Sequence, residues 1–331
     1  MNHINIEKLN TLLILVSLVL AYIFPFELFV IVYAILGPLH YFTEINWIKD
    51  KNYFVKSKTW IYLTLIFAFF IAIPGILKIS NISFLNDLYP FYLLRYGLPK
   101  YSNHLIFLLL IIAFSLLFWK KRKQQLLIIV LGIIVAIAVH QFKTYHILIG
   151  ILLPTLIHVY IFTILFMWYG NLKEKKTINS LNITLMLLVP FFLLIINIDN
   201  TSYHFSETTK SIIAEHFYKL NYTVLDLFGL EKKPDLFFYD SANLKIQIFI
   251  AFAYTYHYLN WFSKTTVIGW HKKITQKKSI LIGTLWLASV GLYFYDYSIG
   301  LAVLLFLSLL HVVMEFPLNI LTLKEVLKKT P

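Results

Sequence analysis

Residues 145–169 read YHILIGILLPTLIHVYIFTILFMWY, a run of 25 residues that contains no Asp, Glu, Lys or Arg. At a rise of about 1.5 Å per residue, a helix of this length crosses the roughly 30 Å hydrocarbon core of a bilayer. Nine comparable apolar runs cover 9–24, 26–46, 59–78, 103–119, 125–143, 180–197, 242–263, 279–295 and 297–320. We therefore expect an all-α protein, a polytopic bundle of about ten transmembrane helices.

The composition supports the same class of protein. Hydrophobic residues make up 59% and charged residues 14% of the 331 residues, which does not suit a soluble domain of this size. No small-residue cleavage site follows a short apolar stretch at the N-terminus, so we expect the run 9–24 to remain as an anchor. The chain has no cysteine, which excludes disulfides, thiolate nucleophiles, iron–sulfur clusters and cysteine-based zinc sites.

Basic residues predict the orientation of the helices. If both termini are cytoplasmic, 20 of the 29 Lys and Arg residues fall in the cytoplasmic segments, as the positive-inside rule requires. We therefore expect a multi-pass protein of the inner (cytoplasmic) membrane, whose formal charge of +13 faces an anionic leaflet. No basic face with interleaved aromatic residues indicates nucleic-acid binding.

Two outer segments, 80–102 and 199–240, are too long or too aromatic to be simple loops, and we expect both to lie on the membrane surface. In the second segment, Ser206 could cap a helix that continues to about Leu220 with an apolar side. No Gly/Ser-rich linker divides the chain, so residues 1–331 are predicted to form a single integral membrane domain.

Four histidines, His40, His158, His257 and His311, lie about 13 to 15 residues after the predicted outer ends of helices that run in the same direction. With a rise of about 1.5 Å per residue, their rings should lie in a slab roughly 3 Å thick. Ionisable groups deep in a membrane helix cost about 2.5–3.5 kcal/mol each, so they normally face one another or a cavity. The spacing therefore predicts a buried metal site.

Carboxylates accompany two of these histidines one helical turn later, as His40 with Glu44 and His311 with Glu315. A histidine-rich, cysteine-free donor set suits non-haem Fe(II), with Zn or Mn as alternatives. The candidate metal ligands are His40, Glu44, His158, His257, His311 and Glu315. His158 could instead bond a neighbouring helix, and the two carboxylates could be interfacial groups.

Three further residues, Tyr41, Tyr254 and Asn260, are candidates for orienting ligands or an oxygen species at such a site. Asn260 could equally form a hydrogen bond between helices. His140 and His146 could form a separate outer pair across a short turn, whereas the other histidines are expected to be solvated.

In this setting the chain resembles the bacterial Brp/Blh-type β-carotene 15,15'-dioxygenase family. His40 with Glu44 resembles the histidine and acid of a Pro-His-Gly-Ala-x-Asp type motif, and Leu310-His311-Val312 resembles a Pro-His-Met type motif. The resemblance implies a multi-pass membrane enzyme with iron bound by histidines from several helices. Tyr41 and Phe42 replace two small residues of that motif and would narrow a carotenoid tunnel, so another long-chain lipid is an alternative substrate.

The leading functional hypothesis is a metal-dependent oxygenase that acts on a lipophilic substrate entering from the bilayer. A proton-coupled transporter or channel that uses the inner His/Glu layer as a relay is the alternative, supported by prolines at Pro38, Pro74, Pro154 and Pro190. Haem held by facing histidines is a third possibility. The chain has no Gly-x-Ser-x-Gly elbow and no P-loop, which gives no support to serine hydrolysis or nucleotide chemistry.

Overall fold

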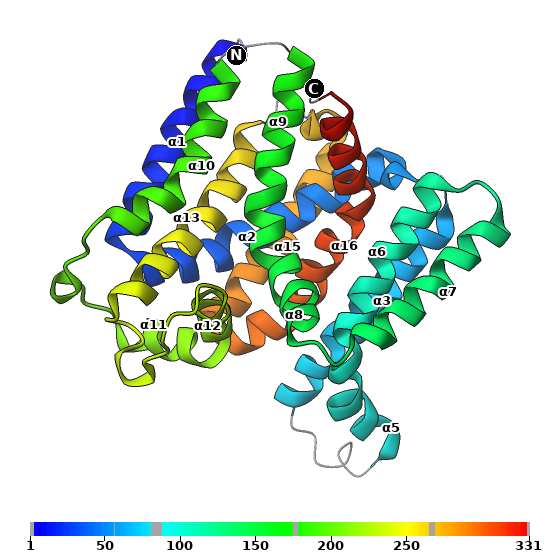
Figure 1. Ribbon diagram of the computed structural model, residues 1–331, viewed down its shortest axis with the longest axis horizontal. Coiled ribbons are helices and arrows are strands. Elements are labelled where there is room, and N and C mark those ends of the chain that lie inside the picture. The colour runs from blue at the N-terminus through cyan, green and yellow to red at the C-terminus, as the bar shows by residue number, and fades with distance from the viewer. Residues whose placement is uncertain (1–2, 56, 81–87, 175–177, 265–268, 330–331) are drawn as a thin grey trace. The chain divides into compact units, whose positions relative to one another are not determined.

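The computed structural model describes residues 3–55, 57–80, 88–174, 178–264 and 269–329, and within these ranges every regular element is a helix (Figure 1). The all-α prediction is therefore confirmed. Each of the ten predicted apolar runs coincides with a helix or with a helical pair. These are α1 (His3–Ile23), α2 (Pro25–Asp50), α3 (Lys58–Ser80), α6 (Ser102–Phe118), α7 (Arg122–Val139), η4 (His146–Phe162) with α9 (Thr163–Glu174), α10 (Ile178–Ile195), α13 (Ser241–Ser263), α15 (Gln276–Tyr295) and α16 (Tyr297–Lys329).

Eight helices of the described ranges are long and apolar enough to cross a membrane, which supports a membrane protein. The apolar part of α10 is shorter, and α13 is long enough but is not among the eight. The number of ten spans and the cytoplasmic termini therefore stay predictions. Helix α13 is polar for a membrane helix because it carries Asn243, Gln247 and His257, all of them buried.

The chain divides into two compact units. The first comprises residues 1–40, 155–272 and 325–331, and the second comprises residues 41–154 and 273–324. In the first unit, α1 packs against α13 and α10, and α10 also packs against α9 and α13 (Figure 1). In the second, α6 packs against α7 and α3. The prediction of a single membrane domain stays a prediction.

Helix α10 contains Pro190, which has no backbone N–H to donate to the carbonyl of Met186 four residues earlier. The hydroxyl of Tyr160, in the π-helical segment η4, donates a hydrogen bond to this carbonyl. Tyr160 and Met186 are both buried. A polar group that proline leaves unpaired inside one helix is thus satisfied by a neighbouring helix, as an apolar environment requires.

The outer segment of the first unit folds onto the helix ends. Ser206 caps α11 (Glu207–Ile212) by accepting a hydrogen bond from the Thr209 N–H, which confirms the predicted cap. The helix continues through a π-helical turn, η6 (Ile213–Phe217), into α12 (Tyr218–Leu227), so it extends beyond the predicted end. Phe26 at the start of α2 is fully buried, with ring centroids 4.9 Å from Phe205 and 5.0 Å from Phe238.

The described part of the other predicted surface segment is helical. It contains α5 (Tyr89–Tyr92), η2 (Leu93–Gly97) and η3 (Leu98–Tyr101), which run directly into α6. The apolar helical stretch Tyr89–Phe118 is 30 residues long. Residues 81–87 lie outside the described residues. Helix α6 thus begins as part of a longer helical stretch than the run 103–119 suggested.

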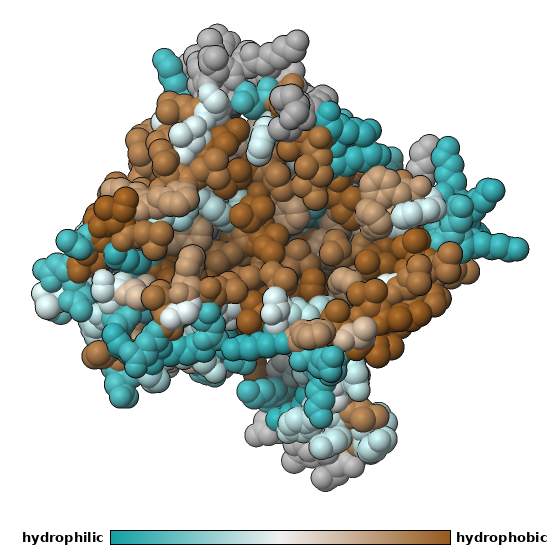
Figure 2. Space-filling model, in the orientation of Figure 1, coloured by the Kyte–Doolittle hydropathy of each residue, from teal (hydrophilic) through white to brown (hydrophobic). Residues whose placement is uncertain are grey.

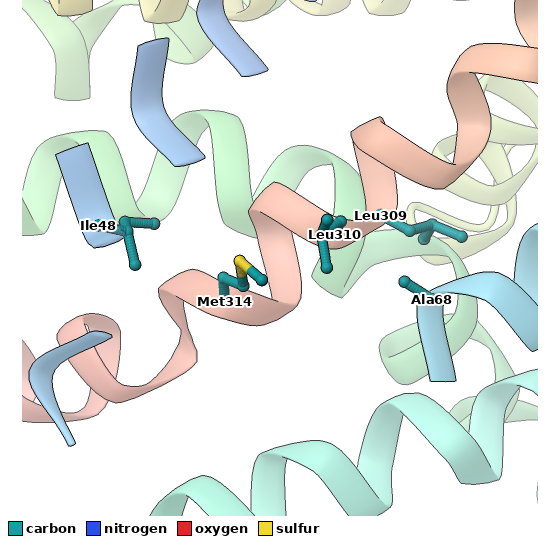
Figure 3. Packing of buried hydrophobic residues seen from close by; sticks show 5 residues of the cluster. All are labelled: Ile48, Ala68, Leu309, Leu310 and Met314. Atoms are coloured by element: carbon teal, nitrogen blue, oxygen red, sulfur yellow. The ribbon is translucent and has the colours of Figure 1, made fainter. Parts of the chain in front are cut away.

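Helices α6 and α7 approach closely because Gly132 has no side chain. An added Cβ would lie 2.7 Å from Cγ2 of Ile111. Figure 2 shows hydrophobic residues over α6 and α7, with hydrophilic residues gathered at the loop that joins them. The same unit contains a core cluster contributed by α2, α3 and α16 (Figure 3): Ile48, Ala68, Leu309, Leu310 and Met314. Its three members on α16, Leu309, Leu310 and Met314, flank His311 in the sequence.

Candidate metal centre

Three of the four predicted histidines lie together in the first unit. His40 on α2 and His257 on α13 face each other, with their Nε2 atoms 3.1 Å apart. The ring of His158, on η4, lies 5.1 Å from the ring of His257 between centroids. All three side chains are at least 92% buried. The helix-depth argument therefore placed these three residues correctly relative to one another.

A threonine that the sequence analysis did not identify holds His257 in place. Thr163, the first residue of α9, donates its hydroxyl hydrogen to the Val159 carbonyl at 2.8 Å. Its oxygen lies 2.9 Å from Nδ1 of His257. Since a hydroxyl has one hydrogen and a carbonyl can only accept, the hydrogen of the second bond belongs to Nδ1 of His257. The neutral His257 ring consequently has its lone pair on Nε2, facing His40.

His311, in the second unit, has the same tautomer as His257, but a different acceptor determines it. Its Nδ1 lies 3.4 Å from the Leu307 carbonyl of its own helix, so this nitrogen is the donor and Nε2 carries the lone pair. The ring of Tyr41 stacks on it, with centroids 4.3 Å apart and an interplanar angle of 23°. Tyr41 was predicted to orient a ligand, and the structure brings it into direct contact with a predicted ligand.

The two predicted carboxylates also lie together in the second unit. The side chains of Glu44 and Glu315 are hydrogen-bonded to each other and buried. Asn319, one turn after Glu315, lies with its amide nitrogen 3.3 Å from Oε2 of that carboxyl group. The two predicted carboxylate ligands are therefore in contact with each other.

Tyr254 and Asn260 contact aromatic residues of the first unit. Tyr254 packs against Tyr33 and Tyr258, and Asn260 accepts a hydrogen bond of 3.5 Å from the hydroxyl of Tyr256 on its own helix. Tyr258 is the aromatic residue beside the rings of both His40 and His257, at 5.2 and 5.5 Å. Its position next to His257 in the sequence is the only signal that could have identified it.

His40 and His158 belong to a buried group of three histidines that could hold a metal ion, since one nitrogen of each lies within 4.8 Å of the others. His257 is not a member of this group, but its Nε2 lies close to that of His40. The donor set fits a metal such as iron or zinc, because neutral imidazoles whose other nitrogen donates to an oxygen are common metal ligands. Two nitrogens bonded to one ion at about 2.1 Å are themselves roughly 3.0–3.4 Å apart. The 3.1 Å separation of His40 and His257 is compatible with a shared ion as well as with a hydrogen bond.

The outer histidines form a second cluster, in the second unit. His146 lies with Nε2 2.7 Å from the His140 carbonyl and Nδ1 2.9 Å from the amide nitrogen of Asn103. Both nitrogens of His146 are therefore used in hydrogen bonds within the protein. The His140 and His104 rings lie 5.2 and 6.4 Å from it. The predicted outer pair is a contact between helix ends, and His146 offers no nitrogen to an ion in this arrangement.

These features define an all-helical protein of the multi-pass membrane type with a buried, histidine-rich polar centre. Comparison of the chain with protein-family models, curated proteins and solved structures found no match.

Proposed function

We propose that this protein is a membrane-embedded metalloenzyme, a non-haem iron oxygenase that acts on a lipophilic substrate. The observation that carries the proposal is the buried histidine group, in which ring nitrogens lie close together. Thr163 and the Leu307 carbonyl accept hydrogen bonds from Nδ1 of His257 and of His311 and so determine their tautomers. Histidine donors without cysteine suit Fe(II), and Zn or Mn are the alternatives. Fe(II) in such a site supplies the ability to bind and activate dioxygen.

In this proposal His40, His158 and His257 of the first unit hold the ion, and His311 stays a predicted further ligand. His257 and His311 present Nε2 because their Nδ1 atoms donate to Thr163 and to Leu307. Tyr41 keeps the His311 ring in position by stacking. Glu44 and Glu315 stay predicted carboxylate ligands, and as a hydrogen-bonded pair they can also give or take a proton.

The surroundings support an apolar substrate. The helices that carry the site belong to a chain with eight helices apolar enough to cross a membrane, and aromatic residues such as Tyr258 and Trp261 pack against His40. An apolar, dry environment suits a carotenoid or another long-chain lipid that enters from the bilayer. The resemblance to the Brp/Blh family supports the same reading.

Elemental analysis with an optical spectrum tests the proposal, on detergent-purified protein that has not been exposed to an affinity-tag metal. We expect about one or two iron atoms per chain without a Soret band. His40→Ala, His257→Ala and His311→Ala should each lose most of the metal while remaining folded, whereas His140→Ala, a histidine outside the site, should keep it. Stoichiometric metal in all three site variants would contradict the proposed ligand set. Carotenoids and long-chain lipids are then screened with the iron-loaded protein.

A proton-coupled transporter is the second candidate, and the hydrogen-bonded Glu44–Glu315 pair favours it. A buried acid pair that shares a proton is a common relay element in transport proteins. In proteoliposomes, a relay predicts a proton flux that Glu44→Gln abolishes and that needs no metal. Bound iron in the absence of such a flux would exclude the relay.

A further inference from the structure

Thr163 is a buried residue that has no direct part in the proposed metal chemistry. It is 2% exposed and lies directly after the π-helical segment that carries His158. In an α-helix, residues five apart point to different sides, whereas the i→i+5 bonding of a π-helix brings them closer to one side. His158 and Thr163 accordingly both contact His257 on α13.

The direction of the hydrogen bonds follows from the donors available. The Val159 carbonyl lies four residues before Thr163 on the same helical run and takes the hydroxyl hydrogen. The lone pair of the Thr163 oxygen is then directed at Nδ1 of His257, and it can be satisfied only by an N–H. A lone-pair-bearing Nδ1 at 2.9 Å would instead place two lone pairs against each other in a buried site, which is unfavourable.

From this geometry we propose that Thr163 is a positioning residue that fixes His257 in the Nδ1–H tautomer and thereby presents its Nε2 to the metal. The expected effect on metal binding rests on the proposed function, whereas the tautomer of His257 is a property of the metal-free protein. Hydrogen bonds of this kind to the second ring nitrogen orient a metal-bound histidine, and their loss weakens metal binding by about 10- to 100-fold.

Two substitutions separate the hydroxyl from the shape of the side chain. Thr163→Val keeps the size and the β-branch but removes the hydroxyl, and Thr163→Ser keeps the hydroxyl. Thr64 provides a matched control, because it is fully buried and its hydroxyl bonds carbonyls of its own helix, those of Trp60 and Ile61. Thr64→Val therefore loses a similar bond to its own helix and leaves the bond between Thr163 and His257 intact.

The first measurement is the nitrogen NMR spectrum of the metal-free protein labelled in its histidine side chains, in which protonated and unprotonated ring nitrogens give well-separated resonances. The His257 signals are assigned by their loss in His257→Gln. We expect the Nδ1–H tautomer in the wild type, in Thr163→Ser and in Thr64→Val, and a mixture of tautomers in Thr163→Val. An unchanged His257 tautomer in Thr163→Val would overturn the inference.

The second measurement is an anaerobic titration with Fe(II) alone. Thr163→Val should bind Fe(II) about 10- to 100-fold more weakly than the wild type, and Thr163→Ser and Thr64→Val should bind it within a few fold of the wild type. Equal affinity of Thr163→Val and the wild type would also overturn the inference. A wild-type protein that binds no Fe(II) would refute the proposed function, while the tautomer would still decide the role of Thr163. If Thr163→Val does not fold, Thr163→Ala replaces it in both measurements.

Discussion

Replacement of Tyr160 by Phe removes the hydroxyl that satisfies the Met186 carbonyl, and leaves the ring in place. This carbonyl lacks its usual α-helical donor, because the residue four positions later is Pro190. Hydrogen bonds between membrane helices contribute about 0.6 kcal/mol on average and up to about 1.7 kcal/mol. Because both partners are buried and the carbonyl lacks its usual α-helical donor, we expect Tyr160→Phe to lower the free energy of unfolding by about 1–1.7 kcal/mol.

Pro190→Ala provides the test of the reasoning, since alanine restores an N–H that can bond the Met186 carbonyl. In the Pro190→Ala background, Tyr160→Phe should cost less than half of what it costs in the wild type. The assay is reversible unfolding in bicelles or mixed micelles, with the four proteins of the double-mutant cycle measured together. Tyr145→Phe is the control, because the Tyr145 hydroxyl is buried without a hydrogen-bond partner among the described residues, and its removal should be neutral or slightly stabilising. An equal cost of Tyr160→Phe in both backgrounds would refute the idea that proline creates the need for this hydroxyl.

Three further predictions concern the packing and the outer segment. Gly150→Ala should destabilise the protein by about 1–3 kcal/mol in unfolding experiments, because the new Cβ would lie 2.2 Å from Oδ1 of Asn103, whereas Gly170→Ala, with no atom within 4 Å, should be neutral or slightly stabilising. Phe26→Ala should cost about 3–5 kcal/mol and expose the segment 199–240 to proteolysis, because the ring is fully buried. Burial, together with the contact with Tyr22, raises the pKa of Tyr203 from 10.0 to about 12, so the fold favours the neutral phenol. The resulting stabilisation is complete below pH 10 and is lost as the pH rises towards 12, and Tyr203→Phe should remove this part of the alkaline pH dependence of unfolding.

Helix positions were predictable from the sequence because apolar runs of bilayer length leave few other structures available. The depth argument also brought His40, His158 and His257 together, since a constant rise per residue converts sequence distance into height. It could not determine which way each ring turns. That property depends on hydrogen bonds to residues such as Thr163, far away in the sequence.

Some contacts at the site could not be read from regular α-helical geometry. The segment η4 is π-helical, so residues five apart lie nearer to the same side than they would in an α-helix. Thr163 was therefore not expected on the side of His158. Asn260 was predicted to orient a ligand, and the contact it makes with the Tyr256 hydroxyl of its own helix was not foreseen. Glu44 and Glu315 were considered separately, each with its own histidine, and their contact with each other depends on the packing of α2 and α16, which no local pattern encodes.

The polar character of α13 has a consequence for the synthesis of the protein. Asn10 of α1 is completely buried, and its side-chain oxygen accepts a hydrogen bond of 2.8 Å from Ser263 at the end of α13. Some 240 residues separate the end of α1 from Ser263, which corresponds to on the order of ten to fifty seconds of translation. If α13 spans the membrane as predicted, α1 is inserted first with this polar side uncovered, and the hydrogen bond that covers it forms only after α13 has been made.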